Sequence, residues 1–331
     1  MPRKVTIAQI AKKAGVSPTT VSFVLNGQEM GISDATVKSV LAIAAEAGYK
    51  RKSASRTGWT RTAYLVSSLN LFSFQTTFFS GVYSHLQRIA PSEKIEPFLL
   101  EFDLKNKNAE SQLHEIFNSM GIDVFFTNDQ SIAKFLKKQN KKVILIQSGE
   151  MKGILSIYCD DYEAGKLAAK VAFRKGHIIA GTLFPESCLN HPRYHGFVET
   201  FTELGGTVLK KYQLEIDFDN ELAVQKIAKF AKKGDLPSFF YCFADNLMFP
   251  MIRGLALAGQ KVPEDVSLMG TDNLYWGKLT YPAFTTVDLC EELFAEKLAE
   301  GIKYLKEGEG EPYSLAVPVL LIERETVKGI N

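Results

Sequence analysis

The sequence contains no apolar run that approaches the ~18 residues of a membrane-spanning helix, and no apolar signal stretch follows its first residues. We therefore expect a cytoplasmic protein with no membrane partner. Its 4 cysteines, Cys159, Cys188, Cys242 and Cys290, lie far apart and show no paired spacing, which favours buried free thiols over metal or redox roles. The composition is otherwise ordinary, and a length of 331 residues predicts two to three domains.

The motifs of several enzyme classes are also missing, since there is no G-x-G-x-x-G, no P-loop and no H-E-x-x-H. Of the 5 histidines, only His191 and His195 have a spacing that could place two metal ligands on one helix face. Their neighbours Pro192 and Arg193 add no carboxylate, so we interpret this pair as the start of a surface helix. The sequence therefore predicts no enzyme, no metal site and no cofactor.

What the sequence does have is an uneven distribution of charge. Residues 1–62 contain ten Lys and Arg against three acidic residues, a net charge of +7, whereas the rest of the chain carries −5. Attraction to phosphates supplies most of the sequence-independent affinity for DNA, so a basic head on an acidic body favours DNA binding. On charge alone, a merely solvated terminus is the alternative.

The first 48 residues predict three short helices. Thr6 and Gln9 form a capping box for the first helix, which Gly15 ends. Ser17 caps the second helix, and Pro18 occupies its first position, where a missing N–H costs nothing. The expected inner faces consist of Ile7, Ile10, Ala11 and Ala14 in the first helix, Val21, Val24 and Leu25 in the second, and Val37, Val40, Leu41 and Ala44 in the third.

A helix, a glycine turn and a second short helix with hydroxyls on its outer face form the plan of a helix-turn-helix, whose second helix enters the major groove. A small all-helical adaptor is the alternative. The segment also resembles the headpiece of the lac repressor family of bacterial regulators at Thr6–Ala11, Ala14–Ser17, Thr20–Ser22 and Val24–Gly27.

The resemblance implies that the second helix reads DNA. It assigns the base-reading positions to Pro18, Thr19, Ser22 and Phe23, the phosphate contacts to Thr20 and Asn26, and further DNA contacts to Thr6, Ser17 and Arg56. The family usually has Arg at position 23, which reads guanine through two hydrogen bonds. Phe23 cannot do this and could pack on a thymine methyl group, so we expect an operator that differs from the common family pattern.

The linker at 49–62 departs further from the family. Its members use a Leu that wedges between minor-groove base steps, and the corresponding residue here is Gly58, followed by Trp59. Either Trp59 supplies a displaced wedge or this protein kinks DNA less. We favour the weaker kink because glycine weakens a helix.

From residue 63 onward, apolar strand-like runs alternate with helical patterns, which predicts parallel sheets covered by helices. Strands are expected at 63–69, 97–102, 124–127, 143–147, 178–184, 208–214, 239–243 and 266–270. Helices are expected at 78–90, 109–119, 130–139, 162–175, 191–204, 219–233, 246–258 and 289–306. Since eight such strand–helix units are too many for one small sheet, we expect an α/β body of two Rossmann-like lobes after the all-α headpiece.

The family resemblance continues through the body at Gly176-His177, Arg193–Phe197, Val262–Gly270 and Tyr281–Val287. It implies a periplasmic-binding-protein-like body whose chain crosses between the lobes three times. The predicted domains are a helix-turn-helix domain at 1–48, a hinge linker at 49–62, and an effector-binding and dimerisation domain at 63–331 with lobe 1 at 63–160 and 290–315 and lobe 2 at 161–289 and 316–331.

Ligands of open α/β sheets bind outside the carboxyl ends of the strands. Those ends and the resemblance together predict effector contacts at Phe78, Phe79, Gln147, Arg193, Phe218, Asp245 and Asp272. Arg and Asp suit a hydroxyl-rich ligand because both form paired hydrogen bonds. Structural ion pairs and core packing are the alternatives for the charged and the aromatic residues, respectively.

These features together predict a repressor that binds double-stranded operator DNA and is nucleoid-associated when bound, and the family resemblance implies that it is a homodimer. A small metabolite between the lobes, expected to be a sugar or a sugar derivative, would shift the population between two states and change the headpiece spacing. A solute-binding protein and a regulator without an effector are the alternatives.

Overall fold

The computed structural model describes residues 5–25, 31–47, 58–67, 78–216, 220–308 and 310–330. It divides into two compact units, one of Met1–Arg61 with Lys105–Asp123 and one of Thr62–Leu104 with Val124–Asn331. Across these described ranges, no helix is both long and apolar enough to cross a membrane. The predicted domain boundaries stay a prediction.

The headpiece, residues 5–47 of the first unit, contains the helices α1 (Ile7–Ala14), α2 (Pro18–Leu25) and α3 (Asp34–Glu46). The predicted capping box is confirmed, because the Thr6 hydroxyl accepts from the Gln9 N–H and the Thr6 N–H donates to Gln9 Oε1 at 2.9 Å. Gly15 ends α1 with a φ of 66°, a left-handed conformation that costs glycine little.

Hydroxyl caps also start the next two helices of the headpiece. Ser17 Oγ accepts from the Thr20 N–H at 3.0 Å, and Ser33 Oγ accepts from the Thr36 N–H at 3.3 Å. The core between the three helices consists of Ile10, Ala11, Val21, Val24, Val37, Val40 and Ala44. The prediction that Leu41 points inward was wrong, since it is 46% exposed. It lies roughly 100° around the helix from Val40, beside the row that meets α1 and α2.

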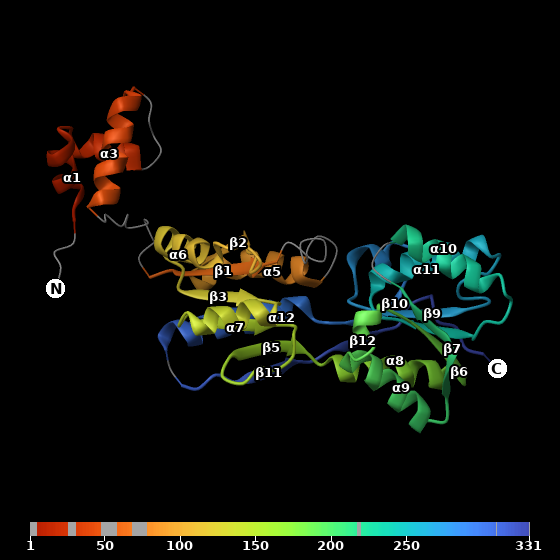
Figure 1. Cartoon of the computed structure of the whole chain (residues 1–331). Coiled ribbons are helices and arrows are strands. Elements are labelled where there is room, and N and C mark those ends of the chain that lie inside the picture. The colour runs from red at the N-terminus through yellow and green to blue at the C-terminus, as the bar shows by residue number, and fades with distance from the viewer. Residues whose placement is uncertain are drawn as a thin grey trace. The chain divides into compact units, whose positions relative to one another are not determined.

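Lobe 1 is built on a six-stranded sheet with the order β11-β5-β4-β3-β1-β2 (Figure 1). Its strands are β1 (Thr60–Val66), β2 (Ile95–Glu101), β3 (Val124–Thr127), β4 (Val143–Ile146), β5 (Leu155–Cys159) and β11 (Ser314–Val317). The same stretches of chain contain the helices α5 (Phe78–Glu93), α6 (Ala109–Met120), α7 (Gln130–Lys138) and α12 (Glu291–Glu307). The pairs from β11 through β1 are parallel.

Lobe 2 is built on a second six-stranded sheet with the order β12-β10-β9-β8-β6-β7. Its strands are β6 (Ile179–Phe184), β7 (Thr207–Glu215), β8 (Phe239–Cys242), β9 (Ser267–Thr271), β10 (Thr285–Asp288) and β12 (Leu320–Ile322). Its helices are α8 (Asp161–Arg174), α9 (Pro192–Glu203), α10 (Asn220–Ala231) and α11 (Met248–Leu257), with 3₁₀ turns at η2 (Glu186–Cys188), η3 (Asp245–Leu247) and η4 (Tyr275–Lys278). The pairings are parallel except that β12 runs antiparallel to β10.

These two sheets confirm the predicted α/β body, and the chain passes between them after β5, after β10 and after β11. The sequence did not predict the strands β5, β10, β11 and β12. Each has only three to five residues, and the sheet-edge strands β11 and β12 contain exposed residues. A short strand offers too few alternations for a pattern to reveal it, and pairing with its neighbours fixes it instead.

The core of the second unit contains residues from both sheets. A single cluster of buried apolar residues includes Phe126 and Ile144 from lobe 1 and Phe197, Phe239 and Tyr241 from lobe 2. The polar groups described below therefore lie beside a continuous apolar interior, where an unpaired charge is costly.

Candidate functional site

The predicted DNA-reading face lies on α2. Its core residues Val21 and Val24 are buried, whereas Phe23 between them is 45% exposed. The residues of α2 that are exposed or half-buried on the other side are Pro18, Thr19, Thr20, Ser22 and Phe23. The helix thus separates a core face from an accessible face of hydroxyl and aromatic side chains.

Hydroxyl groups also gather at the start of α2. Ser17 Oγ and Thr20 Oγ1 lie 2.8 Å apart, beside the first-turn N–H groups. The first turn of a helix carries unpaired N–H groups and the positive end of the dipole, which suit a phosphate. The predicted contacts Asn26, Arg56 and Phe218 lie outside the described residues. Gly58, which is described, has a φ of 87° and is not helical.

In lobe 2, Arg193 of α9 is the centre of a buried polar cluster and is only 3% exposed. Its Nε and Nη2 donate to Asp161 Oδ1 at 3.1 and 2.6 Å, and its Nη1 donates to the Phe243 carbonyl. The Asp272 carboxylate lies 3.9 Å from Nη1, and the guanidinium lies 4.6 Å from the centre of the Phe243 ring. All three nitrogens of the guanidinium therefore donate a hydrogen bond.

A reciprocal glycine contact brings α8 and α9 close enough for this pairing. A Cβ on Gly165 would lie 2.1 Å from the Arg193 carbonyl oxygen, and a Cβ on Gly196 would lie 2.1 Å from the Tyr162 carbonyl oxygen. Both contacts are with backbone, so no side chain could yield to make room. The two glycines therefore allow the N-terminal ends of α8 and α9 to meet, which sets Asp161 opposite Arg193.

Asp161 also links the cluster to lobe 1. Gln147 Nε2 donates to Asp161 Oδ2 at 2.9 Å, while Gln147 Oε1 accepts from the Cys159 N–H at 2.8 Å. Asp161 is not among the predicted site residues, although it lies at the first crossing between the lobes. Its sequence signal was only a pair of acidic residues, and the contact with Arg193 arises from the helix packing.

Asp272 and Asp245 belong to the same part of lobe 2 but differ in their partners. Asp245 is fully buried, and its two oxygens accept from the Thr286 hydroxyl at 2.7 Å and the Leu274 N–H at 3.0 Å. Asp272 has a φ of 117° and adjoins Arg193. Asp245 therefore has two structural partners, whereas Asp272 shares the guanidinium with Asp161.

The predicted aromatic contacts of lobe 1 lie at the start of α5. Phe78 is buried and its ring meets the Phe294 ring edge-on at 5.0 Å, and Phe79 is partly buried against the same apolar cluster. Packing explains Phe78 without a ligand, because Phe294 anchors it to α12. Neither side chain lines the polar pocket described next.

That pocket has a volume of about 670 Å³ and takes residues from both lobes. Gln147 and Asp161 from the Arg193 cluster line it together with His191, whose Nε2 is 3.6 Å from Asp161 Oδ2. The other lining residues are Gln130, Ser148, Gly149, Glu150, Tyr158, Cys159, Asp160, Tyr162, Ser187, Asn190 and Pro192. Its size suits a small molecule, and its lining suits a polar one.

Burial controls the ionisation of this region. It lowers the pKa of His191 to about 4, although Asp161 acts in the opposite direction. It raises the pKa of Asp245 to about 7 and raises the pKa of Asp272 well above its ordinary value despite the nearby Arg193. Burial also opposes the charge of Arg193, but Asp161 and Asp272 outweigh it and raise the pKa of the guanidinium. Arg193 is therefore the cation of this cluster at neutral pH, and His191 is neutral.

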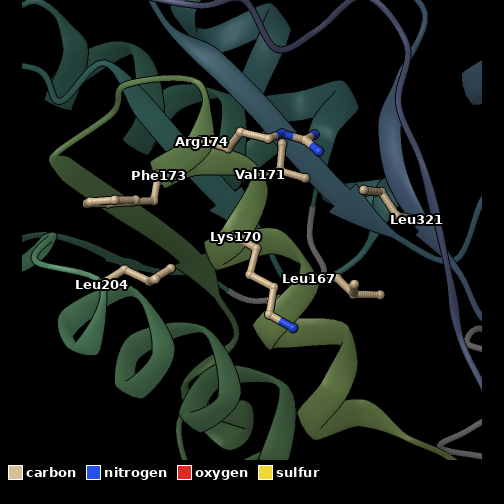
Figure 2. A pocket seen from close by; sticks show the side chains of 7 residues that line it. All are labelled: Leu167, Lys170, Val171, Phe173, Arg174, Leu204 and Leu321. Carbon is tan, nitrogen blue, oxygen red and sulfur yellow. The ribbon is translucent and has the colours of Figure 1, made fainter.

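A second pocket, of about 340 Å³, lies on lobe 2 and is mainly apolar (Figure 2). It is lined by Leu167, Lys170, Val171, Phe173, Arg174, Leu204 and Leu321. Arg174 Nη2 is 2.5 Å from Glu323 Oε1, so its charge is already paired. This pocket contains none of the predicted effector residues, and it is a weaker match for a hydroxyl-rich ligand than the polar pocket. Among the residues with a described structure, no group of His, Cys, Asp and Glu could hold a metal ion.

Comparison with family models matches both parts of the chain. Residues 6–52 match the model for bacterial regulatory proteins of the lacI family, and residues 170–327 match the model for a periplasmic binding protein-like domain. Among curated relatives, the HTH-type transcriptional repressor PurR of Glaesserella parasuis serovar 5 (strain SH0165) is 25% identical and covers 98% of this chain and 99% of its own length. Catabolite control protein A of Priestia megaterium is 26% identical and covers 86% of this chain and 87% of its own length.

Solved structures show the same fold. A complex of the transcriptional regulator CelR with cellobiose has a TM-score of 0.71 at 20% identity and covers 98% of this chain and 100% of its own. The lac repressor dimer bound to operator and the anti-inducer ONPF has a TM-score of 0.70 at 19% identity and covers 99% of this chain and 100% of its own. The match therefore includes the headpiece as well as the two-lobed body.

Proposed function

Since this chain belongs to the lacI family of bacterial regulatory proteins, we propose that it is a homodimeric repressor that binds operator DNA through α2 and responds to a small metabolite bound in the polar pocket. The chain is a DNA-binding transcription regulator and not an enzyme. The observation that carries the proposal is the accessible face of α2, held by a capped helix-turn-helix. A regulator of this kind works in the bacterial cytoplasm, at the nucleoid when it is bound to DNA.

The proposed DNA contacts divide by chemistry. The hydroxyls of Thr6, Ser17 and Thr20 lie at helix starts and contact phosphates, to which Asn26 and Arg56 add further contacts. Pro18, Thr19, Ser22 and Phe23 face the base edges in the major groove. The hydroxyls of Thr19 and Ser22 can donate to or accept from several bases, so they fix position more than base identity.

Phe23 is the distinctive base contact of this proposal. Its ring has no hydrogen-bonding group, yet it lies exposed on α2 in place of packing into the headpiece core. Apolar contact with the C5 methyl group of thymine is the base recognition open to such a side chain. We therefore propose a thymine-containing step at this position of each half-site.

A second copy of the chain is the proposed partner of an exposed surface at η4, which we call the η4 patch and define as Tyr275, Trp276, Leu279 and Tyr281. Trp276 is 67% exposed and Tyr281 is 96% exposed. Large exposed apolar groups that gather in one short segment mark an interaction site. Trp276→Glu should therefore dissociate the dimer in sedimentation experiments, whereas Ile178→Glu, at another exposed apolar residue, should leave it intact.

Of the predicted effector contacts that the structure describes, only Gln147 lines the polar pocket, and the effector is proposed to bind it together with Asp161. Arg193 and Asp272, which lie behind Asp161, are proposed to position that carboxylate, while Phe78, Phe79 and Asp245 lie farther from the ligand and Phe218 stays a predicted contact. Gln147 belongs to lobe 1, whereas Asp161, Arg193 and Asp272 belong to lobe 2. A ligand that replaces contacts between these groups favours one arrangement of the lobes by its differential affinity. That shift in population is the proposed link to operator affinity.

Selection of DNA by the full-length protein from random duplexes tests this function. We expect enrichment of an inverted repeat whose half-sites lie about one helical turn apart, with binding that weakens steeply as salt rises. A solute-binding protein would enrich no sequence. A regulator without an effector would enrich the repeat, but no metabolite in a sugar and nucleoside panel would change its operator affinity.

A further inference from the structure

The polar pocket has acidic but no basic residues among those that line it. Glu150, Asp160 and Asp161 contribute carboxylates, and the fourteen lining residues include neither Lys nor Arg. Burial keeps the lining residue His191 neutral, because it lowers the pKa of the imidazole to about 4. The lining therefore supplies negative charge and no positive charge at neutral pH.

The one buried cation beside the pocket does not reverse this balance. Arg193 pairs with Asp161 and also has Asp272 beside it, so its charge is already matched. Glu150 accepts from the Tyr158 hydroxyl at 2.6 Å, and Asp160 accepts from the Glu163 N–H at 2.9 Å. Both of these donors are neutral, and within the described part of the chain no ion pair joins Glu150 or Asp160 to a basic side chain.

The lysines that follow along α8 are paired with a different carboxylate. Lys166 Nζ is 2.6 Å from Glu163 Oε2, and Lys170 Nζ is 3.5 Å from Glu163 Oε1. Glu163 does not line the pocket. Lys166 Nζ also lies 5.9 Å from the centre of the Tyr162 ring and attracts the Asp160 carboxylate. It therefore offsets part of the charge of Asp160, whereas no ion pair among the described residues offsets that of Glu150.

The uncharged polar groups of the region can form hydrogen bonds with a hydroxylated ligand. Asn128 Oδ1 is buried without a hydrogen-bond partner, and the Asn128 backbone carbonyl accepts from the hydroxyl of the lining residue Ser148. Burying a hydrogen-bond acceptor without a donor is energetically unfavourable. Tyr158 and Tyr162 add aromatic rings to the lining, and such rings attract cations through their faces. Asn128 itself does not line the pocket, and the lining also contains donor groups at Ser187, Asn190 and His191, so the uncharged groups suit a hydroxylated ligand and the carboxylates set the sign of its charge.

We propose that this pocket takes a neutral or amine-bearing hydroxylated small molecule and excludes phosphorylated and carboxylated ones. The assignment rests on the proposed function, in which this pocket holds the effector. An anion entering it would lose water and meet Glu150, Asp160 and Asp161, whereas the neighbouring cations Lys166 and Arg193 lie outside the lining. An ammonium group would keep its charge balanced by those carboxylates, and hydroxyl groups would donate to the free acceptors.

The sign of the charge can be measured with two methanethiosulfonate reagents of similar size, one cationic and one anionic, so that no effector need be known. The reporter is Ser187→Cys, at a lining residue, in full-length protein that also carries Cys188→Ser and Cys290→Ser. The remaining thiols, Cys159 and Cys242, are buried, and the parent without the reporter gives their background rate. After normalisation to a free thiol, the cationic reagent should react about tenfold faster or more.

Matched charge variants identify the source of that preference. Glu150→Gln with Asp160→Asn should bring the rate ratio close to one. Glu307→Gln with Glu311→Gln, which removes the same charge from exposed residues outside the pocket lining, should leave it unchanged. A ratio near one in the reporter protein, or one that survives the first pair of substitutions, overturns the proposal. Neither result affects DNA selection, so failure of this inference and failure of the proposed function are separable.

Discussion

The headpiece and the cluster around Arg193 are both stabilised by polar contacts, but the two sets differ in the sequence separation of the residues that they join. Thr6 with Gln9, Ser17 with Thr20 and Ser33 with Thr36 are each three residues apart. Arg193 lies 32 residues from Asp161 and 50 from Phe243. The headpiece contacts are also exposed, whereas the Arg193 contacts are buried. A capping contact therefore stabilises one helix, whereas the buried cluster depends on the whole body being folded.

The largest expected effect follows from removing the main partner of Arg193. Asp161→Ala leaves a buried guanidinium without its closest carboxylate, and breaking a buried pair in this way costs about 3–5 kcal/mol. Urea denaturation of the body, followed by tryptophan fluorescence, measures this loss. Glu300→Ala is the control, because it breaks the exposed pair with Lys297 and should change the midpoint little. Equal losses in the two variants would contradict the conclusion that the buried pair contributes more to stability than an exposed one.

A second test uses the pH dependence of a buried carboxyl group. The folded protein raises the pKa of Asp245 to about 7 from an ordinary 3.8, so folding favours its protonated form. The associated stability is present below pH 3.8 and is lost as the pH rises through 7. Relative to Asp245→Asn, the natural protein should therefore lose stability between pH 5 and 8, on the order of a few kcal/mol.

The difference between these two proteins isolates Asp245 from other groups that titrate. Glu291, whose pKa burial raises to about 7, acts in the same direction, and His191, whose pKa burial lowers, acts in the opposite one. Both are present in the natural protein and in Asp245→Asn, so their contributions cancel. Parallel curves of unfolding free energy against pH would contradict the assignment to Asp245.

A smaller and local effect is expected in the headpiece. Ser17→Ala removes the side-chain cap of α2 and should lower the local stability of that helix by about 1 kcal/mol. Hydrogen exchange of the α2 amides measures it directly, and Ser39→Ala, on the exposed face of α3, serves as the control. Loss of protection throughout the body would mean that the cap is not local.

The same contrast explains how much the sequence could predict. The caps at Thr6, Ser17 and Gly15 depend on residues a few positions apart, so they could be identified before the structure. The contact between Asp161 and Arg193 could not, because it depends on Gly165 and Gly196 allowing two helices to approach. The structure brings Arg193 and Gln147, both predicted as effector contacts, to the same carboxylate, that of Asp161, which the sequence marked only as one of two adjacent acidic residues.

The sequence also could not predict which of two adjacent apolar side chains in a helix faces the core. Val40 and Leu41 both fit the pattern of an inner face, and packing against α1 and α2 buries only Val40. The short strands β10 and β12 were missed for a related reason, since each is defined by its partner strand more than by its own residues. The helix ends could be predicted from neighbouring residues, whereas the long-range contacts depend on how the helices and strands pack.

The most direct test of the central claim, that α2 reads DNA through its exposed face, is operator selection by the natural protein and by Phe23→Arg. Because this contact is local, the substitution should leave the unfolding of the body unchanged. It should replace thymine by guanine at one position in each half-site, since Arg reads guanine through two hydrogen bonds. Selection of the same sequence by both proteins would contradict the assignment of Phe23, and selection of no sequence by the natural protein would contradict the claim as a whole.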